Sequence, residues 1–409
     1  MRCCSLLIAF NSDPSHPLLA SPLLQDMSKS SKSPVRPTTS SYNIVLHALA
    51  NSGDMAAPEQ AQLLLDEMKS KGASASNSLR PDTVTYTTAI SVMCRLGGHI
   101  VLEMVDKLLK EAIHTPGVTV DAMFFSNVLS SLAFCRGPGA ADYAEEIVQK
   151  KMPSLKIEPD ILVWNGLLNV YAKNGSGVEA EAVLERMEKG PVPPNLQSYT
   201  VVLDAYAKSD SHSSIARAET LIQRLQESSD LQPDAKAYTC LIQKYARSSL
   251  PLKAKRAQAV LLNAIEKGVR PTTITYNAVL NACAYTNSTD LKEKEEAFTV
   301  ACLVFDDVRK SSKPNHVTYG TFLDVIIKLM PKSDARNDIA ELVFKRCCKD
   351  GQVSQLVLRK LKAAVPLSLY RQMLGGDTED QLPRKWTANV RERRGGPAGG
   401  IKRKATLAR

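Results

Sequence analysis

The sequence predicts an all-α protein, an α-solenoid of stacked helix-turn-helix repeats. The first observation is a motif that returns along the chain: a proline, then a residue suited to cap a helix, and an aromatic residue five positions after the proline. The second is apolar spacing at i, i+3, i+4 and i+7, which is typical of one helical face. The third is that no run of useful length alternates apolar and polar residues, as a half-buried strand would. Because one helical pair of about 40 residues cannot bury its own apolar face, successive pairs must stack.

The motif defines eight repeats, numbered 1 to 8, within residues 37–351. We call the opening residue of each repeat its anchor and give other positions as offsets from it, so that +5 is the aromatic residue. The anchors are Pro37, Pro81, Val120, Pro159, Pro194, Pro233, Pro271 and Pro314. The aromatic residues are Tyr42, Tyr86, Phe125, Trp164, Tyr199, Tyr238, Tyr276 and Tyr319. An aromatic residue in every copy fixes the register of all the other columns.

Three further segments flank the repeats. Residues 1–36 form an N-terminal extension with two compatible interpretations: an organelle transit segment, or the second helix of a partial preceding repeat. Residues 352–374 are predicted to form a helix that caps the last repeat. Residues 375–409 form a Gly-rich, basic tail that we expect to be disordered, apart from a dock near Trp386. This tail either binds phosphates or a localisation receptor, or only improves solubility.

Composition narrows the class of protein. The net charge of the 409 residues is +10, but residues 383–409 hold nine Lys or Arg and one acidic residue, which leaves only +2 for the rest. Bulk charge therefore does not make the repeats a nucleic-acid binder. The nine cysteines include no C-x-x-C pair and favour neither a disulfide framework nor a zinc site. No apolar run approaches the length of a bilayer span, so we expect no membrane contact. We also expect no metal and no cofactor.

The +6 column is polar in seven of the eight repeats. Asn, Thr and Ser are mediocre helix formers, and this position lies inside the first helix, so folding alone gives them no expected role. The column consists of Asn43, Thr87, Ser126, Asn165, Thr200, Thr239, Asn277 and Gly320.

Two other columns accompany it. The +1 residues are ordinary N-cap types, so capping alone is one interpretation of them; they are Thr38, Asp82, Asp121, Asp160, Asn195, Asp234, Thr272 and Asn315. The +14 residue is basic in five repeats, as Arg95, Lys173, Lys208, Arg247 and Lys328. A lone lysine near a helix C-terminus is usually a dipole partner. A basic residue that recurs beside a line of small polar groups indicates a nucleic-acid ligand. The basic residues would contact its phosphates, and the small polar groups would bond to the edges of its bases.

These columns resemble the pentatricopeptide repeat family, whose consensus opens with Pro-Asp, an apolar residue and Thr-Tyr-Asn. The likeness is carried by segments such as residues 270–277, Arg-Pro-Thr-Thr-Ile-Thr-Tyr-Asn, and covers about residues 35–351. It implies a right-handed solenoid that binds single-stranded RNA, one base per repeat, in a mitochondrion or plastid. It also implies that each base edge is read jointly by the +6 residue of one repeat and the +1 residue of the next.

The resemblance implies seven reading pairs. In chain order they are Asn43 with Asp82 for uracil, Thr87 with Asp121 for guanine, Ser126 with Asp160 for guanine more weakly, Asn165 with Asn195 for a pyrimidine, Thr200 with Asp234 for guanine, Thr239 with Thr272 without assignment, and Asn277 with Asn315 for a pyrimidine. With cytosine favoured at the two pyrimidine positions, the implied site is approximately U-G-G-C-G-N-C. The +3 residues implied to sandwich bases are Val84, Met123, Leu162, Ile274 and Val317. The phosphate-binding residues are the five basic residues at +14.

Two alternatives remain beside the RNA hypothesis. The first is a tetratricopeptide-like scaffold that holds a protein in its groove, for example within an organellar ribonucleoprotein; the Trp-x-x-Leu-Gly-x-x-Tyr pattern of such repeats is lacking here. The second is an enzyme. None of the six histidines is followed two residues later by Glu, so the zinc signature of an RNA-editing deaminase is missing. We therefore expect a monomeric, non-enzymatic protein that binds single-stranded RNA, with RNA-processing or ribosomal proteins as further partners.

Overall fold

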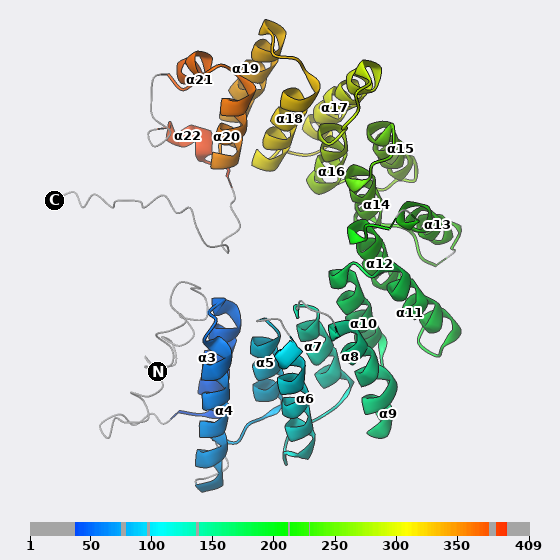
Figure 1. Cartoon of the computed structure of the whole chain (residues 1–409), viewed down its shortest axis with the longest axis vertical. Coiled ribbons are helices and arrows are strands. Elements are labelled where there is room, and N and C mark those ends of the chain that lie inside the picture. Colours follow the sequence, from blue (N-terminus) through cyan, green and yellow to red (C-terminus); the bar gives the residue numbers. More distant parts are fainter. Residues whose placement is uncertain are drawn as a thin grey trace, which may run out of the picture. The chain divides into compact units, whose positions relative to one another are not determined.

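The computed structural model describes residues 37–74, 79–95, 99–135, 139–211, 213–228, 230–375 and 382–390. These residues belong to two compact units, one up to Lys313 and one from Pro314 onward. Within the described residues the regular elements are helices, with no strand (Figure 1). The predicted N-terminal extension and most of the predicted basic tail lie outside this part of the chain. The all-α prediction is confirmed.

Seven repeats make up the first unit, each with two helices in the predicted order. The first helices are α3 (Thr39–Ser52), α5 (Thr83–Cys94), α7 (Ala122–Leu132), α10 (Ile161–Asn174), α12 (Leu196–Lys208), α14 (Ala235–Arg247) and α16 (Thr273–Ala284). The second helices are α4 (Ala57–Ser74), α6 (His99–His114), α11 (Gly177–Lys189), α13 (Ser214–Glu227), α15 (Lys253–Glu266) and α17 (Leu291–Ser311). In repeat 3 the second helix runs through α8 (Ala140–Glu146), a π-helical stretch (Ile147–Lys151) and α9 (Met152–Ser154).

The first helices begin where the +1 residue caps them. The Asp82 carboxylate accepts a hydrogen bond from the Thr85 backbone N–H at 2.8 Å, and the Asp121 carboxylate accepts one from the Phe124 N–H at 2.8 Å. Such bonds satisfy N–H groups that have no partner inside the helix. The interpretation of +1 as a capping column is therefore correct, and it leaves open whether these residues have a second role.

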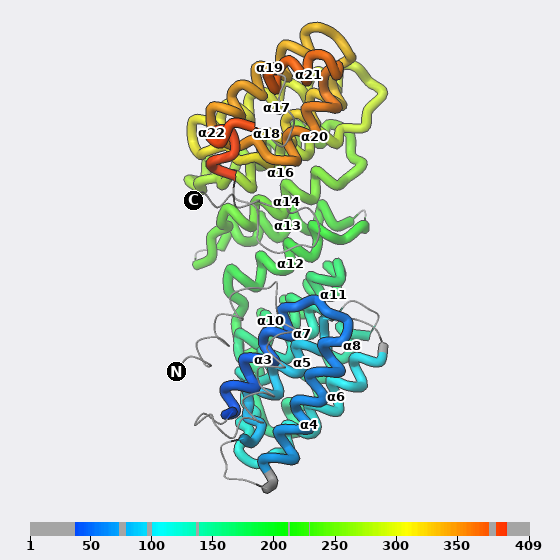
Figure 2. Tube along the Cα trace, turned by 90° about the vertical axis from the view of Figure 1, so that its left-hand side faces the viewer, coloured from blue at the N-terminus to red at the C-terminus, as the bar shows by residue number. Residues whose placement is uncertain are grey.

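Stacking of the first helices forms a continuous layer in the first unit. Each first helix packs on its own second helix and on the first helix of the next repeat. Helices α3, α5, α7 and α10 follow one another in a row in Figure 1 and lie one behind the other in Figure 2. The +5 aromatic residues lie in this layer, and Tyr42, Tyr86 and Phe125 are fully buried. In these repeats the aromatic residue thus contributes a large buried side chain, whereas Trp164 and Tyr199 are half-buried.

The second unit contains repeat 8 and the residues after it. Repeat 8 consists of α18 (His316–Leu329) and α19 (Asp334–Lys349), followed by α20 (Gln355–Ala364), α21 (Leu367–Met373) and α22 (Arg384–Thr387). Helix α20 packs on α18 as consecutive first helices do. It lies close to Gly320, where a Cβ atom would come within 3.1 Å of the Leu356 side chain. The missing +6 side chain of repeat 8 therefore leaves space for α20.

The dock that the sequence predicted near Trp386 is present in the second unit. The Trp386 indole packs edge-on against Phe344 with ring centroids 5.8 Å apart. The Trp386 carbonyl accepts a hydrogen bond from the Val353 N–H at 2.8 Å. These contacts attach α22 to α19 and to the turn that precedes α20. In the described part of the chain, no helix is both long and apolar enough to cross a bilayer.

Candidate nucleic-acid interface

One face of each first helix carries the columns that the sequence singled out. Offsets +3, +6, +10 and +14 are three or four residues apart, so their side chains follow one another along a single helical face. We call this face of the first helices the inner face.

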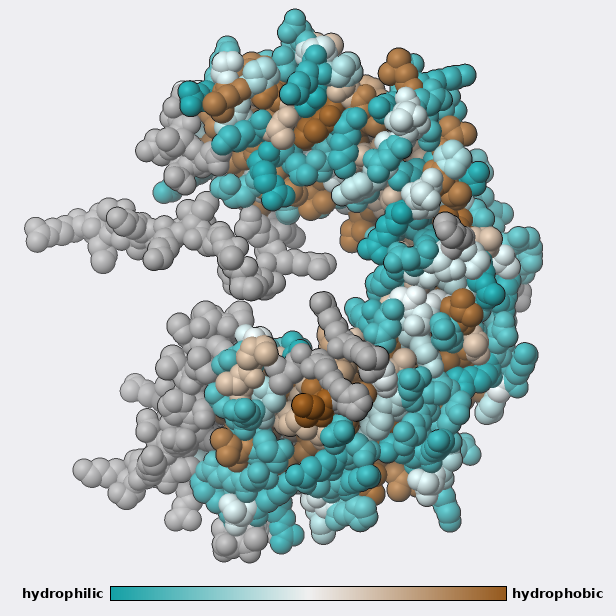
Figure 3. Space-filling view, in the orientation of Figure 1, coloured by the Kyte–Doolittle hydropathy of each residue, from teal (hydrophilic) through white to brown (hydrophobic). Residues whose placement is uncertain are grey.

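The +3 column is exposed although several of its residues are apolar. The five predicted sandwiching residues, Val84, Met123, Leu162, Ile274 and Val317, leave between 37% and 62% of their surface accessible. The remaining +3 residues, Ser40, Gln197 and Lys236, are exposed as well. Figure 3 shows exposed hydrophobic side chains singly or in small groups among hydrophilic ones. Large apolar side chains at one repeated exposed position have no role in the core, and they suit contact with the flat faces of a ligand.

At two junctions between repeats, a hydroxyl of the next repeat bonds the +6 asparagine. Between repeats 1 and 2, the Thr85 hydroxyl donates to Asn43 Oδ1 at 2.7 Å, and Asn43 Nδ2 donates to Asp82 Oδ1 at 3.1 Å. Between repeats 4 and 5, the Ser198 hydroxyl donates to Asn165 Oδ1 at 2.7 Å. The hydroxyl residue stands at +4 in both cases. The expectation that folding gives the +6 residues no role is therefore wrong here, because they also tie repeats together.

The junction between repeats 6 and 7 is linked by two hydroxyls. The Thr239 and Thr275 Oγ atoms lie 2.8 Å apart, and the Thr239 hydroxyl also donates to the Ala235 carbonyl at 2.5 Å. Since Thr239 gives its single proton to its own helix, Thr275 is the donor between the two.

Three junctions have an apolar residue at +4 instead: Phe124, Val163 and Ala237. At these junctions no hydrogen bond joins the +6 side chain to a described residue of the next repeat. The Thr87 hydroxyl donates to the Thr83 carbonyl at 3.0 Å, and the Thr200 hydroxyl donates to the Leu196 carbonyl at 2.7 Å. A threonine that gives its proton to its own helix presents an oxygen that accepts hydrogen bonds.

The +1 carboxylates keep one oxygen unused while they cap. Every capping bond of Asp82, Asp121, Asp160 and Asp234 is made by Oδ1. Their Oδ2 atoms make no hydrogen bond within the described residues, and Asp121 and Asp234 are exposed. Capping and ligand contact are thus compatible in one side chain, since a carboxylate accepts several bonds.

The basic residues at +14 differ in whether they bond to other groups of the protein. Lys173 is exposed and makes no hydrogen bond or ion pair among the described residues. Lys208 Nζ lies 2.5 Å from Asp204 Oδ2 and 3.4 Å from the Ala172 carbonyl oxygen. Arg247 donates to the Ala207 carbonyl at 3.2 Å. Lys208 and Arg247 therefore also bond the C-terminal end of the preceding first helix, where a cation is favoured.

The other two basic residues at +14 lie elsewhere in the chain. The Arg95 guanidinium lies 5.4 Å from the centroid of the Phe134 ring, close enough for a cation–π interaction. Lys328 is exposed and belongs to the second unit. The sequence places Asn277 and Asn315 in one reading pair, but these residues fall in different units, and that pair stays a sequence prediction.

Sequence reasoning missed the +10 column, which is polar in all eight repeats. It consists of His47, Ser91, Ser130, Asn169, Asp204, Gln243, Asn281 and Asp324. All of these residues are exposed or half-buried. This column could have been found in the sequence. A polar residue, charged or uncharged, stands at +10 in all eight repeats, which is as regular as the aromatic residue at +5.

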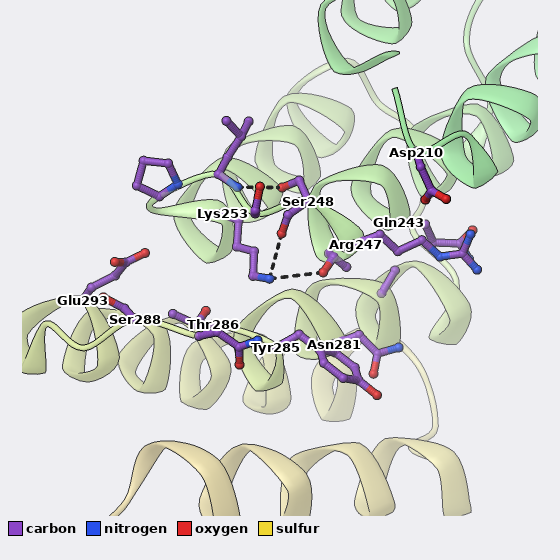
Figure 4. Close-up of a pocket in the computed structure, with 16 residues that line it drawn as sticks. Asp210, Gln243, Arg247, Ser248, Lys253, Asn281, Tyr285, Thr286, Ser288 and Glu293 are labelled. Carbon is purple, nitrogen blue, oxygen red and sulfur yellow. Dashed lines mark hydrogen bonds between the residues drawn. The ribbon is translucent and has the colours of Figure 1, made fainter. Parts of the chain in front are cut away.

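The inner face widens into a hollow of about 930 Å³ between repeats 6 and 7. Gln243 and Arg247 of α14 line one side, and Asn281 of α16 and Tyr285, which follows the end of that helix, line the other (Figure 4). At its margin the Lys253 ammonium donates to the Ser248 carbonyl at 3.0 Å and so caps the end of α14. The lining residues at +10 and +14 extend the polar stripe of the inner face.

The perturbed titratable groups of the repeats lie in helix contacts. Burial and a bond to Glu188 raise the pKa of Tyr199 to about 12. Burial raises the pKa of the Cys240 and Cys283 thiols to about 12 as well, so both remain protonated and poorly nucleophilic. Among the described residues, no group of three or more His, Cys, Asp or Glu is arranged to hold a metal ion. The inner face offers hydrogen bonds, apolar contact and positive charge.

The fold and the inner face define a class: helical-repeat proteins that present the same few positions of every repeat to a ligand. A model of the PPR repeat family matches residues 37–95 and 159–208, and a model of the pentatricopeptide repeat domain matches residues 221–285. The matched segments are pentatricopeptide repeats.

Relatives of known sequence cover parts of the chain. It is 31% identical over 200 residues to pentatricopeptide repeat-containing protein At5g15010, mitochondrial, of Arabidopsis thaliana, covering 48% of this chain and 32% of that one. It is 24% identical over 167 residues to small ribosomal subunit protein mL103 (rPPR7) of the same organism, covering 41% of this chain and 36% of that one. The chain therefore spans about a third of the length of these relatives.

A solved structure supports the fold. The crystal structure of the pentatricopeptide repeat protein PPR10 from maize superposes with a TM-score of 0.50 at 20% sequence identity, covering 92% of this chain and 54% of that chain. This likeness confirms the architecture of stacked helical repeats.

Proposed function

We propose that the chain binds single-stranded RNA along its inner face, with about one base per repeat. The observation that carries the proposal is the exposed +3 column, where apolar side chains recur one helical turn from the polar +6 residues. Unpaired bases have two apolar faces and a polar edge, so a repeated apolar side chain beside a repeated polar one matches both parts. The cations at +14 lie on the same face, where they suit the phosphates.

The hydrogen-bond polarity of the +6 residues supports a choice of base. Asn165 accepts the Ser198 hydroxyl through its oxygen, which leaves its NH₂ group to donate. Thr200 donates to its own helix and keeps an oxygen that accepts. Pyrimidines offer an acceptor at O2, whereas guanine offers donors at N1 and N2. This polarity agrees with a pyrimidine at Asn43 and Asn165 and with guanine at Thr87 and Thr200.

The site read by the chain is therefore approximately U-G-G-C-G-N-C, 5′ to 3′. The bound segment is kept single-stranded and covered, which shields it from nucleases or leaves it open to processing, splicing or translation factors. The chain acts as a monomer in a mitochondrion or plastid, since relatives are named as mitochondrial or chloroplastic proteins. Its inner face supplies binding groups, and chemistry on the RNA is left to recruited partners.

A reader exchange tests this proposal on the full chain. The N165T/N195D variant is predicted to change the preferred fourth base from a pyrimidine to guanine, because both new side chains present acceptors. Fluorescence anisotropy with A-A-A-U-G-G-C-G-U-C-A-A-A and its fourth-base variants, with heparin as competitor, measures the preference. The matched control is T88V, because the Thr88 side chain makes no hydrogen bond within the part of the chain that the structure describes. An unchanged base preference in N165T/N195D would contradict readout by the +6 and +1 columns.

One comparison favours a second candidate function. A relative is named as a protein of the small ribosomal subunit, and a protein partner within such a particle would also bind a helical groove. This alternative predicts that the full chain binds none of the RNAs above better than an A₁₃ strand.

A further inference from the structure

We infer that the +4 hydroxyl of each following repeat is a positioning residue, which sets the hydrogen-bond polarity of the preceding +6 reader. This inference rests on the proposed function and goes beyond it, because the +4 residue itself faces the core. Thr85 and Ser198 have no exposed surface. They contact a base only through Asn43 and Asn165.

The same geometry recurs at two separate junctions. The Oγ–Oδ1 distance is 2.7 Å between Thr85 and Asn43 and 2.7 Å between Ser198 and Asn165. In each case the hydroxyl oxygen also accepts the backbone N–H of the +1 residue, at 3.1 Å from Asp82 and 3.2 Å from Asn195. The hydroxyl oxygen also lies 2.8 Å from Asp82 Oδ1 and 3.1 Å from Asn195 Oδ1. The asparagine oxygen is the nearer acceptor at both junctions, so the hydroxyl directs its single proton to the amide.

A primary amide has one oxygen that accepts and one NH₂ group that donates. When the buried hydroxyl donates to the oxygen, the amide is held with its NH₂ as the remaining group. At Asn165 this NH₂ has no partner among the described residues. At Asn43 it donates to Asp82 Oδ1, which strengthens the same orientation because the opposite one would bring two oxygens together. The buried hydroxyl thereby orients the asparagine so that its NH₂ group is the hydrogen-bond donor toward the RNA.

The sequence repeats the same pairing of residue types, although Asn277 Oδ1 accepts no hydrogen bond among the described residues. Each asparagine at +6 is followed by a hydroxyl residue at +4 of the next repeat: Thr85, Ser198 and Thr318. Three of the four Thr or Ser readers are followed by an apolar residue: Phe124, Val163 and Ala237. The exception, Thr239 before Thr275, is the pair without an assigned base. The identity of the +4 residue thus follows the type of reader that precedes it.

The test removes one hydroxyl and restores it. Full-length wild type, S198A and S198T are compared by fluorescence anisotropy with A-A-A-U-G-G-C-G-U-C-A-A-A and with RNAs that carry U, G or A at the fourth base of the site. S198A is expected to lower the preference for a pyrimidine over a purine at that base by about tenfold, the effect of one lost directed hydrogen bond. Preferences at the other bases should stay unchanged, and S198T should restore the wild-type preference.

The matched control is S41A, which removes a +4 hydroxyl that follows no reader within the eight repeats. It should leave every base preference unchanged, and circular dichroism should show that both alanine variants fold. T85A, tested at the first base, keeps the inference falsifiable if S198A does not fold. The inference is overturned if S198A retains the pyrimidine preference, or if it weakens all four RNAs equally as a purely structural role would. If wild type distinguishes none of the RNAs, the proposed function itself has failed.

Discussion

Two neighbouring junctions of the first unit differ in how they hold their readers. Between repeats 4 and 5, the Ser198 hydroxyl bonds Asn165 across the junction. Between repeats 5 and 6, Ala237 stands in the place of the serine, and Thr200 bonds its own helix at Leu196. Both readers are buried, with 5% and 2% of their surface accessible. The comparison teaches that the same scaffold presents either a donor or an acceptor, and that a residue outside the reading pair helps to set which.

The largest expected effect comes from rebuilding the second junction as the first. The T200N/D234N/A237S variant is predicted to change the preferred fifth base from guanine to a pyrimidine, a change in discrimination of about 1–3 kcal/mol. Selection from a pool randomised at that base measures it. T200N/D234N, which lacks only the new hydroxyl, should change the preference less. An equal change in both variants would break the comparison.

Acid should lower the free energy of unfolding through Asp106, which lies outside the two junctions compared above. Although burial opposes ionisation, bonds from Lys110, Lys151 and Tyr143 lower the pKa of Asp106 to about 2. Since this pKa lies below the unfolded value, the stabilisation, about 2 kcal/mol, is present above about pH 4 and lost as the pH falls toward 2. Urea unfolding between pH 2 and pH 6 should show a smaller pH dependence in D106N than in wild type. Equal dependence in both would contradict the assignment.

Removal of the Thr85 hydroxyl should cost stability at a hydroxyl-linked junction. T85V keeps the shape of the side chain but loses the hydrogen bond donated to Asn43 and the one accepted from the Asp82 backbone N–H, so we predict a decrease of about 1 kcal/mol in the free energy of unfolding. T88V makes the same chemical change one turn away at a threonine without a hydrogen bond, and it should stay within about 0.5 kcal/mol of wild type. A larger loss in T88V would show that the junction bonds contribute little.

The smallest effects are expected in the basic column. K173A should weaken binding of every RNA sequence and lower the slope of log affinity against log salt by about 1, because Lys173 is free to neutralise a phosphate. K208A should change this slope less, since Lys208 is already bonded to Asp204 and to the Ala172 carbonyl. Titrations at several salt concentrations separate the two. A larger slope change in K208A would contradict the division of the column.

The order and type of the helices could be predicted from the sequence because the same residue pattern occurs in eight repeats. An N-cap at +1 and an aromatic residue at +5 fix where each first helix begins and which face it buries. A pattern seen once is weaker. The π-helical stretch at Ile147–Lys151 and the space that Gly320 leaves for Leu356 depend on packing that no periodicity reports.

The polar columns of the inner face were also visible in the sequence, but not their hydrogen bonds. The link from Ser198 to Asn165 joins residues 33 positions apart, in different repeats, and depends on how the first helices stack. The same holds for Lys208 at the Ala172 carbonyl, which the sequence presented only as a phosphate contact. The +10 column, in contrast, needed no structure and was missed because each of its residues is ordinary on a helix surface.

The most direct test of the account is selection of bound sequences by the full chain from a random single-stranded RNA pool at physiological salt, with heparin as competitor. The account predicts enrichment of a motif near U-G-G-C-G-N-C, with its strongest preferences at the bases read by Asn43, Thr87, Asn165 and Thr200. A bound pool without any shared motif would contradict readout of RNA by the repeat columns.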